Sequence, residues 1–464
     1  MKLTKKTEII ILVLILVFAL FLRLWHLGMP DMWIDETTSS LAASKIIEHG
    51  VPRLDSGTLY SRALVFHYLQ AFFMIIIQND FTARLISVLF GLASIVLAYF
   101  IAREYSKPAA IIAAVFTAVF FIQIFFSRQA RMYQMFQFFF YLSIFLLYKA
   151  KQLNSKKLLY ISLISLIILV DTQIAGLVLV PFYIIFILKY FRKNYLTLII
   201  PVAVSLYYGL GFISSIWLKT DVVSNYLEGY TNFFSLTITA YIILAVIGII
   251  FAFYKNKELT FYLLIPSIVL FFGLIFVKLF GLRYMYFLFF LIPIFLAIFF
   301  SILYKKYNWI ILIALAFALI YPSNLFFQYN YNTIIKPVAV NFYDSTAPIL
   351  DYKSISPQTL ALLKDKDNKL MVLFQSGPAW YIKKPDYVFP FSETGFAGRY
   401  PTYNNTDYYT GAQFTTTKPS SSFYLIEDVF SQSKLTSEEK SKYDLIKTNC
   451  SLVEETKSLK IFKC

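Results

Sequence analysis

The sequence has few charged residues for its length. Of 464 residues, 15% are Asp, Glu, Lys or Arg, whereas 59% are hydrophobic and 19% are aromatic. Soluble domains typically carry about 25% charged and about 45–50% apolar residues. This shortage of charge argues against an ordinary soluble protein and predicts a chain that lies mostly in a membrane.

Cysteine and histidine are also scarce. The two cysteines, Cys450 and Cys464, lie near the C-terminus, and the chain has three histidines. The absence of a CxxC pair or a Cys/His cluster argues against a structural zinc site. The two cysteines are compatible with a disulfide outside the cytosol and equally with two thiols.

Long apolar runs follow one another through residues 1–327. A membrane-spanning helix needs roughly 20 apolar residues, and the sequence predicts about eleven of them, the first an uncleaved span because no small-residue cleavage site follows it. The predicted spans are 9–26, 82–102, 108–127, 132–148, 158–171, 173–188, 195–216, 236–254, 259–277, 284–304 and 308–326.

The positive charge follows the alternation of these spans. The formal net charge is +16, which by itself would suggest nucleic-acid binding. With the N-terminus in the cytoplasm, however, the predicted cytoplasmic segments hold 16 basic and three acidic residues, while the other segments are nearly balanced. Because Lys and Arg favour cytoplasmic loops, the excess charge reports topology, and we expect no nucleic-acid partner.

Two polar segments interrupt this pattern. A long outer loop, 27–81, separates the first two spans, and its segments Ile34–His49 and Leu64–Ile77 are predicted to be surface helices. We assign this loop to a membrane domain, 1–327. The tail, 328–464, is predicted to be a small extracytoplasmic α/β domain, with strands near 369–374, 423–426, 443–447 and 458–462 and a helix within 431–443.

The outer loop carries two adjacent acids, Asp35 and Glu36, at the start of the first predicted surface helix. One interpretation is an acidic first turn favoured by the helix dipole. The other is a general base, because apolar surroundings raise the pKa of a carboxylate toward a useful range.

Arginines gather at the predicted outer face. Arg128 and Arg131 lie between the third and fourth spans and would share one face of a helix. Two guanidiniums suit a phosphate, which they bind through paired hydrogen bonds; the alternative is contact with lipid headgroups. Arg62 and Arg283 are further candidates for phosphate binding.

In this order, these strings resemble the dolichyl-phosphate-mannose protein mannosyltransferases and the related aminoarabinose lipid A transferase. The strings are Asp35-Glu36, Arg62 before Phe66-His67-Tyr68, Ala83–Ser87, Ser127–Tyr133, and Arg283-Tyr284 before Pro293. The resemblance covers most of residues 1–325 and implies the GT-C fold, a polytopic helical membrane protein with a soluble outer domain.

The resemblance also implies an inverting transferase in the cell membrane that uses a polyprenyl-phosphate-linked sugar. Asp35 would be the base, with Glu36 beside it, and the arginines would hold the lipid phosphate. Tyr133, His67 and Tyr284 would position substrates. We expect no required cofactor, although two acids and a phosphate could bind a divalent cation. The acceptor is a hydroxyl on a protein, glycolipid or polymer.

Other functions remain open at this point. A transporter or lipid flippase would place ionisable residues near the bilayer midplane and contain repeated halves. In this chain the charges gather at one face and no internal repeat is seen. A non-catalytic assembly or sensor protein would not need paired arginines beside an acidic loop.

Overall fold

The structure is a computed structural model that describes residues 4–216, 239–276, 282–306, 350–373, 376–390, 402–403, 406–407, 409–432 and 435–464. Its internal contacts divide the chain into two compact units. The membrane unit comprises Met1–Leu27 and Arg84–Val338, and the outer unit comprises Gly28–Ala83 and Ala339–Cys464. This grouping differs from the predicted one, because the outer loop shares a unit with the tail and not with the spans.

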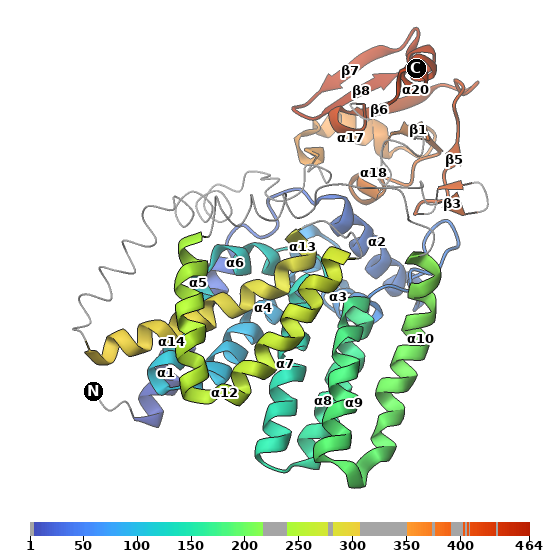
Figure 1. Ribbon diagram of the computed structural model, residues 1–464. Coiled ribbons are helices and arrows are strands. Elements are labelled where there is room, and N and C mark those ends of the chain that lie inside the picture. Colours follow the sequence, from blue (N-terminus) through green and yellow to red (C-terminus); the bar gives the residue numbers. More distant parts are fainter. Residues whose placement is uncertain are drawn as a thin grey trace. The chain divides into compact units, whose positions relative to one another are not determined.

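The membrane unit is helical. Figure 1 shows its helices in blue to yellow, and their bounds are α1 (Lys5–Leu24), α4 (Asp80–Arg103, which starts in the outer unit), α5 (Lys107–Val119), α6 (Phe121–Ser127), α7 (Tyr133–Gln152), α8 (Lys156–Thr172), η1 (Ile174–Leu179), α9 (Val180–Tyr190), η2 (Arg192–Leu198), α10 (Ile199–Ile216), α12 (Thr239–Phe276), α13 (Leu282–Met285), η3 (Tyr286–Phe290) and α14 (Leu291–Lys306).

Several of these helices can cross a membrane. Within the described ranges, four are long and apolar enough, and a fifth arises if α5 and α6 count as one span bent by 59°. A polytopic helical membrane fold is therefore confirmed, while the number of about eleven spans stays a prediction. The predicted span 308–326 lies outside the described residues.

Breaks occur close to the predicted boundaries. The described parts of the predicted spans 236–254 and 259–277 both lie in α12, which is broken at Asn256, where φ is −151° and ψ is 79°. The Asn256 side chain accepts a hydrogen bond from the N–H of Leu259 at 3.1 Å and so caps the second half. The α8 helix ends with Gln173 as its C-cap, at the boundary between the predicted spans 158–171 and 173–188.

One break was not predicted. The predicted span 108–127 is divided at Phe120, whose φ of −65° and ψ of 117° are extended. The carbonyls that precede such a break lose their partners in the following turn, so they need other hydrogen-bond donors within the unit.

Charges tie the N-terminal helix to its neighbours. Glu8 of α1 is 2% exposed and forms ion pairs with Lys107 at 2.9 Å and with Arg103 at 3.3 Å. The start of α1, the end of α4 and the start of α5 therefore meet at one end of the unit. This is the arrangement that the predicted alternation of spans requires.

The outer unit contains two helices from the loop after α1. These are α2 (Ile34–His49), which has the predicted bounds, and α3 (Leu64–Met74), which ends three residues before the predicted boundary. The rest of the unit is the tail, with η5 (Tyr352–Ser354), α17 (Pro357–Lys364), α18 (Ser376–Tyr381), α19 (Val429–Gln432), α20 (Ser437–Lys447) and the strands β1 (Lys369–Val372), β2 (Tyr387–Val388), β3 (Thr402–Tyr403), β4 (Thr406–Asp407), β5 (Gln413–Phe414), β6 (Phe423–Asp428), β7 (Ser451–Glu455) and β8 (Leu459–Lys463).

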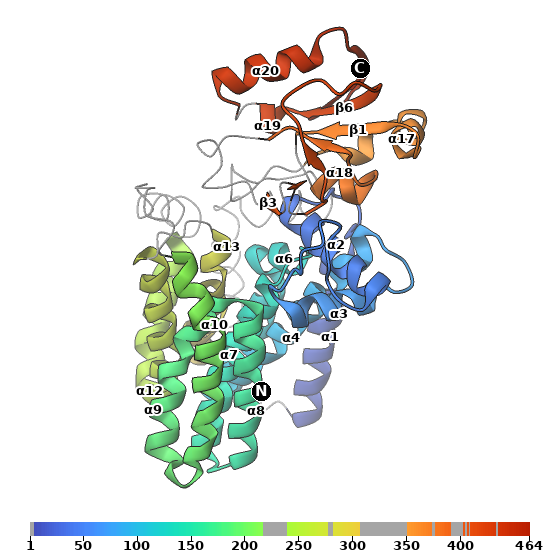
Figure 2. The ribbon, with the colours of Figure 1, turned by 90° about the vertical axis from the view of Figure 1, so that its right-hand side faces the viewer.

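These strands form one mixed sheet in the order β3-β4-β5-β2-β1-β6-β8-β7. Successive residues of a strand point to opposite faces, and β1 uses both faces. Leu370 and Val372 pack in a core with Leu363 of α17, whereas Met371 packs in a second core with Tyr443 and Ile446 of α20. Figure 2 shows α20 on one side of the sheet and α17 with α18 on the other. The small α/β domain is confirmed.

One predicted strand is wrong. Residues 443–447 form the last turns of α20, whose start is fixed by a capping box in which Thr436 and Glu439 exchange hydrogen bonds. Tyr443 and Ile446 are buried three residues apart, which is helical spacing. The short apolar run was read with the wrong period.

The outer loop and the tail share a core. Ile34, at the start of α2, packs against the same core as Leu363. The N–H of Met32 donates to the Tyr381 hydroxyl at 2.6 Å. The Lys353 ammonium donates to the carbonyl oxygens of Gly28 at 2.8 Å and Met29 at 3.3 Å. These contacts explain why the loop belongs to the outer unit.

Cys450 and Cys464 form a disulfide between the turn before β7 and the end of β8. They are 14 residues apart. A loop of about this length restricts the unfolded chain by about 3 kcal/mol. We expect the double variant Cys450→Ala/Cys464→Ala to lower the free energy of unfolding by about that amount, measured by denaturation of the full chain in detergent. Reductant should destabilise the wild type and leave the variant unchanged; equal stability of the two proteins would contradict the expectation.

Asp428, at the end of β6, is 2% exposed, and this burial raises the pKa of its carboxyl to about 6, against the hydrogen bond that the Ser431 N–H donates at 2.6 Å. Because the folded state favours the protonated carboxyl, its contribution to the free energy of unfolding is present in full below the unfolded pKa of about 3.9. That contribution is lost as the pH rises through the folded pKa of about 6, by at most about 1.4 kcal/mol per pH unit. We therefore expect Asp428→Asn to gain stability relative to wild type between pH 4.5 and 7.5 in thermal unfolding. A stability difference that does not change with pH would contradict this assignment.

Candidate functional site

The two acids occupy the first turn of α2. The helix begins at Ile34 after Trp33, so Asp35 and Glu36 lie at its positive end. Glu36 is buried at 2% exposure, whereas Asp35 is half-buried, and the Asp35 carbonyl accepts a hydrogen bond from the Ser39 hydroxyl at 3.0 Å. Asp35 is therefore the more exposed of the two acids.

His67 lies in α3 of the same unit and is 1% exposed. Its Nδ1 lies 3.3 Å from Gln70 Oε1, and its ring packs edge-on against Tyr60 at 5.3 Å between centroids. Arg62 is exposed just before the helix, and Ala63 between them has a φ of 50°. The left-handed Ala63 turns the chain sharply, so the exposed Arg62 is followed within a few residues by the buried face of α3, which includes His67.

Arg128 is fixed by hydrogen bonds to backbone carbonyls. It is 6% exposed, and its Nη1 donates to the carbonyl oxygens of Leu22 at 3.1 Å, Arg23 at 3.0 Å and Trp25 at 2.7 Å. These are carbonyls at the end of α1, which lack partners within the helix. Arg128 therefore caps α1 from a distant part of the chain.

Residues 128–132 form a turn between α6 and α7 and not part of a helix. Helical spacing therefore does not place Arg128 and Arg131 on one face, and that part of the prediction is wrong. Arg131 is 7% exposed, and its guanidinium carbon lies 5.6 Å from the centroid of the Tyr133 ring. Its carbonyl accepts a hydrogen bond from the Ser87 hydroxyl of α4 at 3.1 Å.

Arg283 and Tyr284 lie together in the short helix α13. The Arg283 guanidinium carbon is 5.2 Å from the centroid of the Tyr284 ring, and both side chains are partly exposed. Tyr133, by contrast, is buried and packs edge-on against Phe126 at 5.9 Å. Arg131 and Arg283 therefore each have an aromatic ring beside the guanidinium, which favours a fixed guanidinium plane.

Arg23 of α1 caps the helix end at the unpredicted break, as Arg128 caps the end of α1. It is fully buried, and its Nη1 donates at 3.0 Å to the carbonyl oxygen of Ala118, two residues before Phe120. Arg84 of α4 is 3% exposed and donates to the carbonyl oxygen of Leu27 at 2.8 Å. The sequence analysis did not single out Arg23, and it included Arg84 only within the string Ala83–Ser87.

Three buried guanidiniums thus crowd around the end of α1. Burial, followed by the positive charges of Arg84 and Arg23, lowers the pKa of the Arg128 guanidinium to about 9. In the described part of the chain, Arg23 and Arg128 hydrogen-bond to neutral carbonyls and form no ion pair. An anion brought to this end of the unit would therefore meet two guanidiniums, those of Arg23 and Arg128, whose charge these carbonyls do not neutralise.

A buried polar network lies close by and was missed from the sequence. The Tyr286 hydroxyl lies 2.7 Å from Gln123 Oε1 and 2.5 Å from Gln134 Oε1, and Gln137 Nε2 donates to the Tyr286 carbonyl at 2.9 Å. The Tyr286 ring stacks on Phe126 at 4.1 Å. Glutamines in apolar helices are costly unless paired, so their occurrence in predicted spans was a usable signal.

The described residues contain no group of three or more His, Cys, Asp or Glu side chains arranged to hold a metal ion. The chemistry offered by the described site residues is therefore that of guanidiniums, a carboxylate pair, a buried imidazole and aromatic rings.

Comparison with known proteins agrees with this architecture. Residues 61–217 match the family model of dolichyl-phosphate-mannose-protein mannosyltransferases. ArnT from Cupriavidus metallidurans superposes with a TM-score of 0.61 at 11% identity, over 98% of this chain and 97% of ArnT in the apo state. The chain has the GT-C fold of membrane glycosyltransferases. The predicted fold class and family resemblance are both confirmed.

Two further solved structures extend the comparison. ArnT bound to undecaprenyl phosphate superposes with the same TM-score of 0.61 at 11% identity and covers 99% of this chain and 98% of that one. The oligosaccharyltransferase of Archaeoglobus fulgidus, tethered with an acceptor peptide, gives 0.56 at 13% identity over 92% of this chain and 69% of that chain. Among curated protein sequences, none matches.

The GT-C chain packs α1, α4 and α6 closely at one glycine. A Cβ on Gly91 of α4 would lie 2.6 Å from Ser127 Cβ and 3.0 Å from Arg23 Nε. We expect Gly91→Ala to destabilise the protein by about 1–3 kcal/mol because the helices must move apart. Gly209→Ala in α10 is the matched control, since nothing lies within 4 Å of its Cβ. Thermal unfolding in detergent compares the two; similar midpoints would contradict the close packing at Gly91.

Proposed function

We propose that this protein transfers a sugar from a polyprenyl-phosphate carrier to a hydroxyl acceptor on the non-cytoplasmic face of the cell membrane. The observation that carries this proposal is the group of three buried guanidiniums, Arg23, Arg84 and Arg128, around the end of α1. Such a group would stabilise a phosphate. Because the GT-C fold is that of membrane glycosyltransferases, we take this phosphate to be that of a lipid-linked sugar donor.

Relatives of the same fold support the class of donor. One ArnT structure contains undecaprenyl phosphate. The AglB oligosaccharyltransferase of Archaeoglobus fulgidus, which superposes with a TM-score of 0.50, was solved with an inhibitory peptide and a dolichol-phosphate. Both ligands are lipid phosphates, and we extend that chemistry to this chain.

In the proposed reaction, one bond to the anomeric carbon of the sugar forms while another breaks. The acceptor hydroxyl oxygen attacks the anomeric carbon from the side opposite the phosphate, and the bond between that carbon and the phosphate oxygen breaks with its electron pair. The leaving polyprenyl phosphate gains negative charge as this bond breaks. Fixed guanidiniums stabilise that charge more strongly in the transition state than in the ground state, which is the requirement for catalysis.

Asp35 is the proposed base that accepts the proton of the attacking hydroxyl. It is half-buried in the first turn of α2, beside the buried Glu36. We propose Arg62, Arg128, Arg131 and Arg283 as phosphate ligands, and Tyr133, His67 and Tyr284 as residues that position the substrates. Arg128 already holds three carbonyls through one nitrogen, so the rest of its guanidinium would serve the ligand.

We propose a cytoplasmic N-terminus and an extracytoplasmic outer unit. The Cys450–Cys464 disulfide supports this side for the tail, since disulfides persist outside reducing compartments. The ion pairs of Glu8 with Lys107 and Arg103 gather the basic helix ends at the opposite, cytoplasmic end of α1. A lipid-linked donor suits an active site that nucleotide sugars made in the cytosol do not reach.

Asp35→Asn tests the base. We expect transfer from radiolabelled polyprenyl-phosphate sugars to crude membrane acceptor to fall by about 10²–10⁴-fold, because a general base contributes about that much. Binding of polyprenyl phosphate should be retained, because the phosphate ligands are untouched. Asp444→Asn, an exposed carboxylate in α20, is the matched control and should keep full activity.

Full transfer by Asp35→Asn would remove Asp35 as the base. Absence of transfer by the wild type with every donor, together with movement of the labelled lipid between leaflets of vesicles, would favour a flippase instead. We propose that no metal is required, so the wild type should keep its activity in EDTA.

A further inference from the structure

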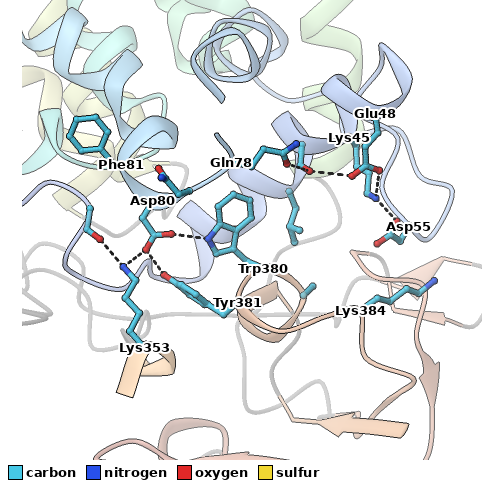
Figure 3. Close-up of a pocket in the computed structure, with 15 residues that line it drawn as sticks. Lys45, Glu48, Asp55, Gln78, Asp80, Phe81, Lys353, Trp380, Tyr381 and Lys384 are labelled. Atoms are coloured by element: carbon cyan, nitrogen blue, oxygen red, sulfur yellow. Dashed lines mark hydrogen bonds and ion pairs between the residues drawn. The ribbon is translucent and has the colours of Figure 1, made fainter. Parts of the chain in front are cut away.

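The outer unit contains a cavity that the proposed chemistry does not use. Its volume is about 750 Å³, within the range of about 300–1,000 Å³ that is common for small-molecule sites. The lining comes mainly from α2 and the loop after it, the start of α4 and the segment before it, η5 and the region of α18, all within the outer unit. Figure 3 shows the side chains around it.

One wall is aromatic and is held by a single buried carboxylate. Asp80, 5% exposed, accepts hydrogen bonds from Trp380 Nε1 and from the Tyr381 hydroxyl, each at 2.9 Å, and forms an ion pair with Lys353. The Tyr381 ring also stacks on Tyr352 at 5.2 Å between centroids. Because the indole N–H is bound to Asp80, the orientation of the Trp380 ring is fixed against the cavity.

The opposite wall is polar. Lys45 of α2 forms ion pairs with Glu48 at 2.6 Å and with Asp55 at 2.9 Å. Gln78 Oε1 accepts a hydrogen bond from the Ser44 hydroxyl at 2.7 Å. In Figure 3 Gln78 and Trp380 lie between the Asp80 group and the Lys45 group. Two pre-organised polar groups therefore flank one aromatic ring.

The charges in the lining balance. Three lysines face three carboxylates, namely Lys45, Lys353 and Lys384 with Glu48, Asp55 and Asp80. A strongly anionic ligand would be repelled by the carboxylates, and a cationic ligand by the lysines. Carboxylates accept hydrogen bonds, ammonium groups donate them, and side-chain amides do both. This mixture, beside a fixed aromatic ring, matches a neutral ligand that has many hydroxyl groups and apolar ring faces.

We propose that this cavity binds a neutral oligosaccharide, which is the acceptor glycan of the transferase or part of it. The assignment as acceptor rests on the proposed function, whereas the binding of the saccharide does not. The sugar would lie against Trp380, and its hydroxyls would hydrogen-bond to Gln78, Asp55 and Lys384. The acceptor class is thereby narrowed from any hydroxyl compound to a glycan or a glycan-bearing molecule.

The test measures binding without any donor. The full-length protein in detergent is applied to an array of neutral, phosphorylated and sulfated oligosaccharides, and the best neutral ligand is then titrated by calorimetry. We expect Trp380→Ala and Lys384→Ala each to weaken binding by about tenfold or more. Lys366→Ala, an exposed lysine outside the cavity, should bind like the wild type. Lys384 is exposed, so its variant keeps the test valid if Trp380→Ala fails to fold.

Three results would overturn the proposal: no neutral oligosaccharide binds the wild type, the anionic glycans bind better, or binding is unchanged in Lys384→Ala and Trp380→Ala. Donor turnover is measured separately by release of labelled polyprenyl phosphate. Saccharide binding without donor turnover would refute the transferase and keep the binding site. Turnover without saccharide binding would refute the binding site and keep the transferase.

Discussion

Backbone carbonyls at buried helix ends need hydrogen-bond donors from the protein, because no water is available to satisfy them. This constraint organises the membrane unit. The end of α1 is satisfied by Arg128, and the end of α5 at the Phe120 break is satisfied by Arg23. Each arginine reaches across about one hundred residues of sequence, so the two together fasten α1 to the helices after α4.

The arginines that satisfy these carbonyls also bring positive charge to the end of α1. A guanidinium that caps a helix end remains charged, and its neutral carbonyl partners do not cancel that charge. Arg84 adds a third guanidinium beside the others, by donating to the carbonyl of Leu27. Structural capping therefore leaves a concentration of positive charge, which suits a lipid phosphate. The hydrogen bonds that satisfy these helix ends thus also gather the guanidiniums on which the proposed phosphate binding depends.

The outer unit follows a different rule. Successive residues of its central strand pack in two cores, one with α20 on one face of the sheet and one with α17 on the other. The loop after α1 joins this unit through Ile34, Met32 and the carbonyls of residues 28–30. The loop that carries the acidic pair is thereby positioned by the tail, which gives the tail a structural task even apart from any ligand.

The sequence by itself determined the features that depend on local composition and period. Charge scarcity predicted the membrane class, the bounds of α2 were predicted to the residue, and the apolar run at 369–374 predicted β1. Where two periods competed, as in residues 443–447, the capping box of α20 decided for a helix. The tertiary structure alone decided which carbonyls Arg128 and Arg23 bind, that the outer loop joins the tail, and that Asp80 fixes Trp380. These pairings join residues from about 100 to 350 positions apart, and no periodicity reports contacts of that range, because they are selected by packing and by the need to satisfy buried polar groups.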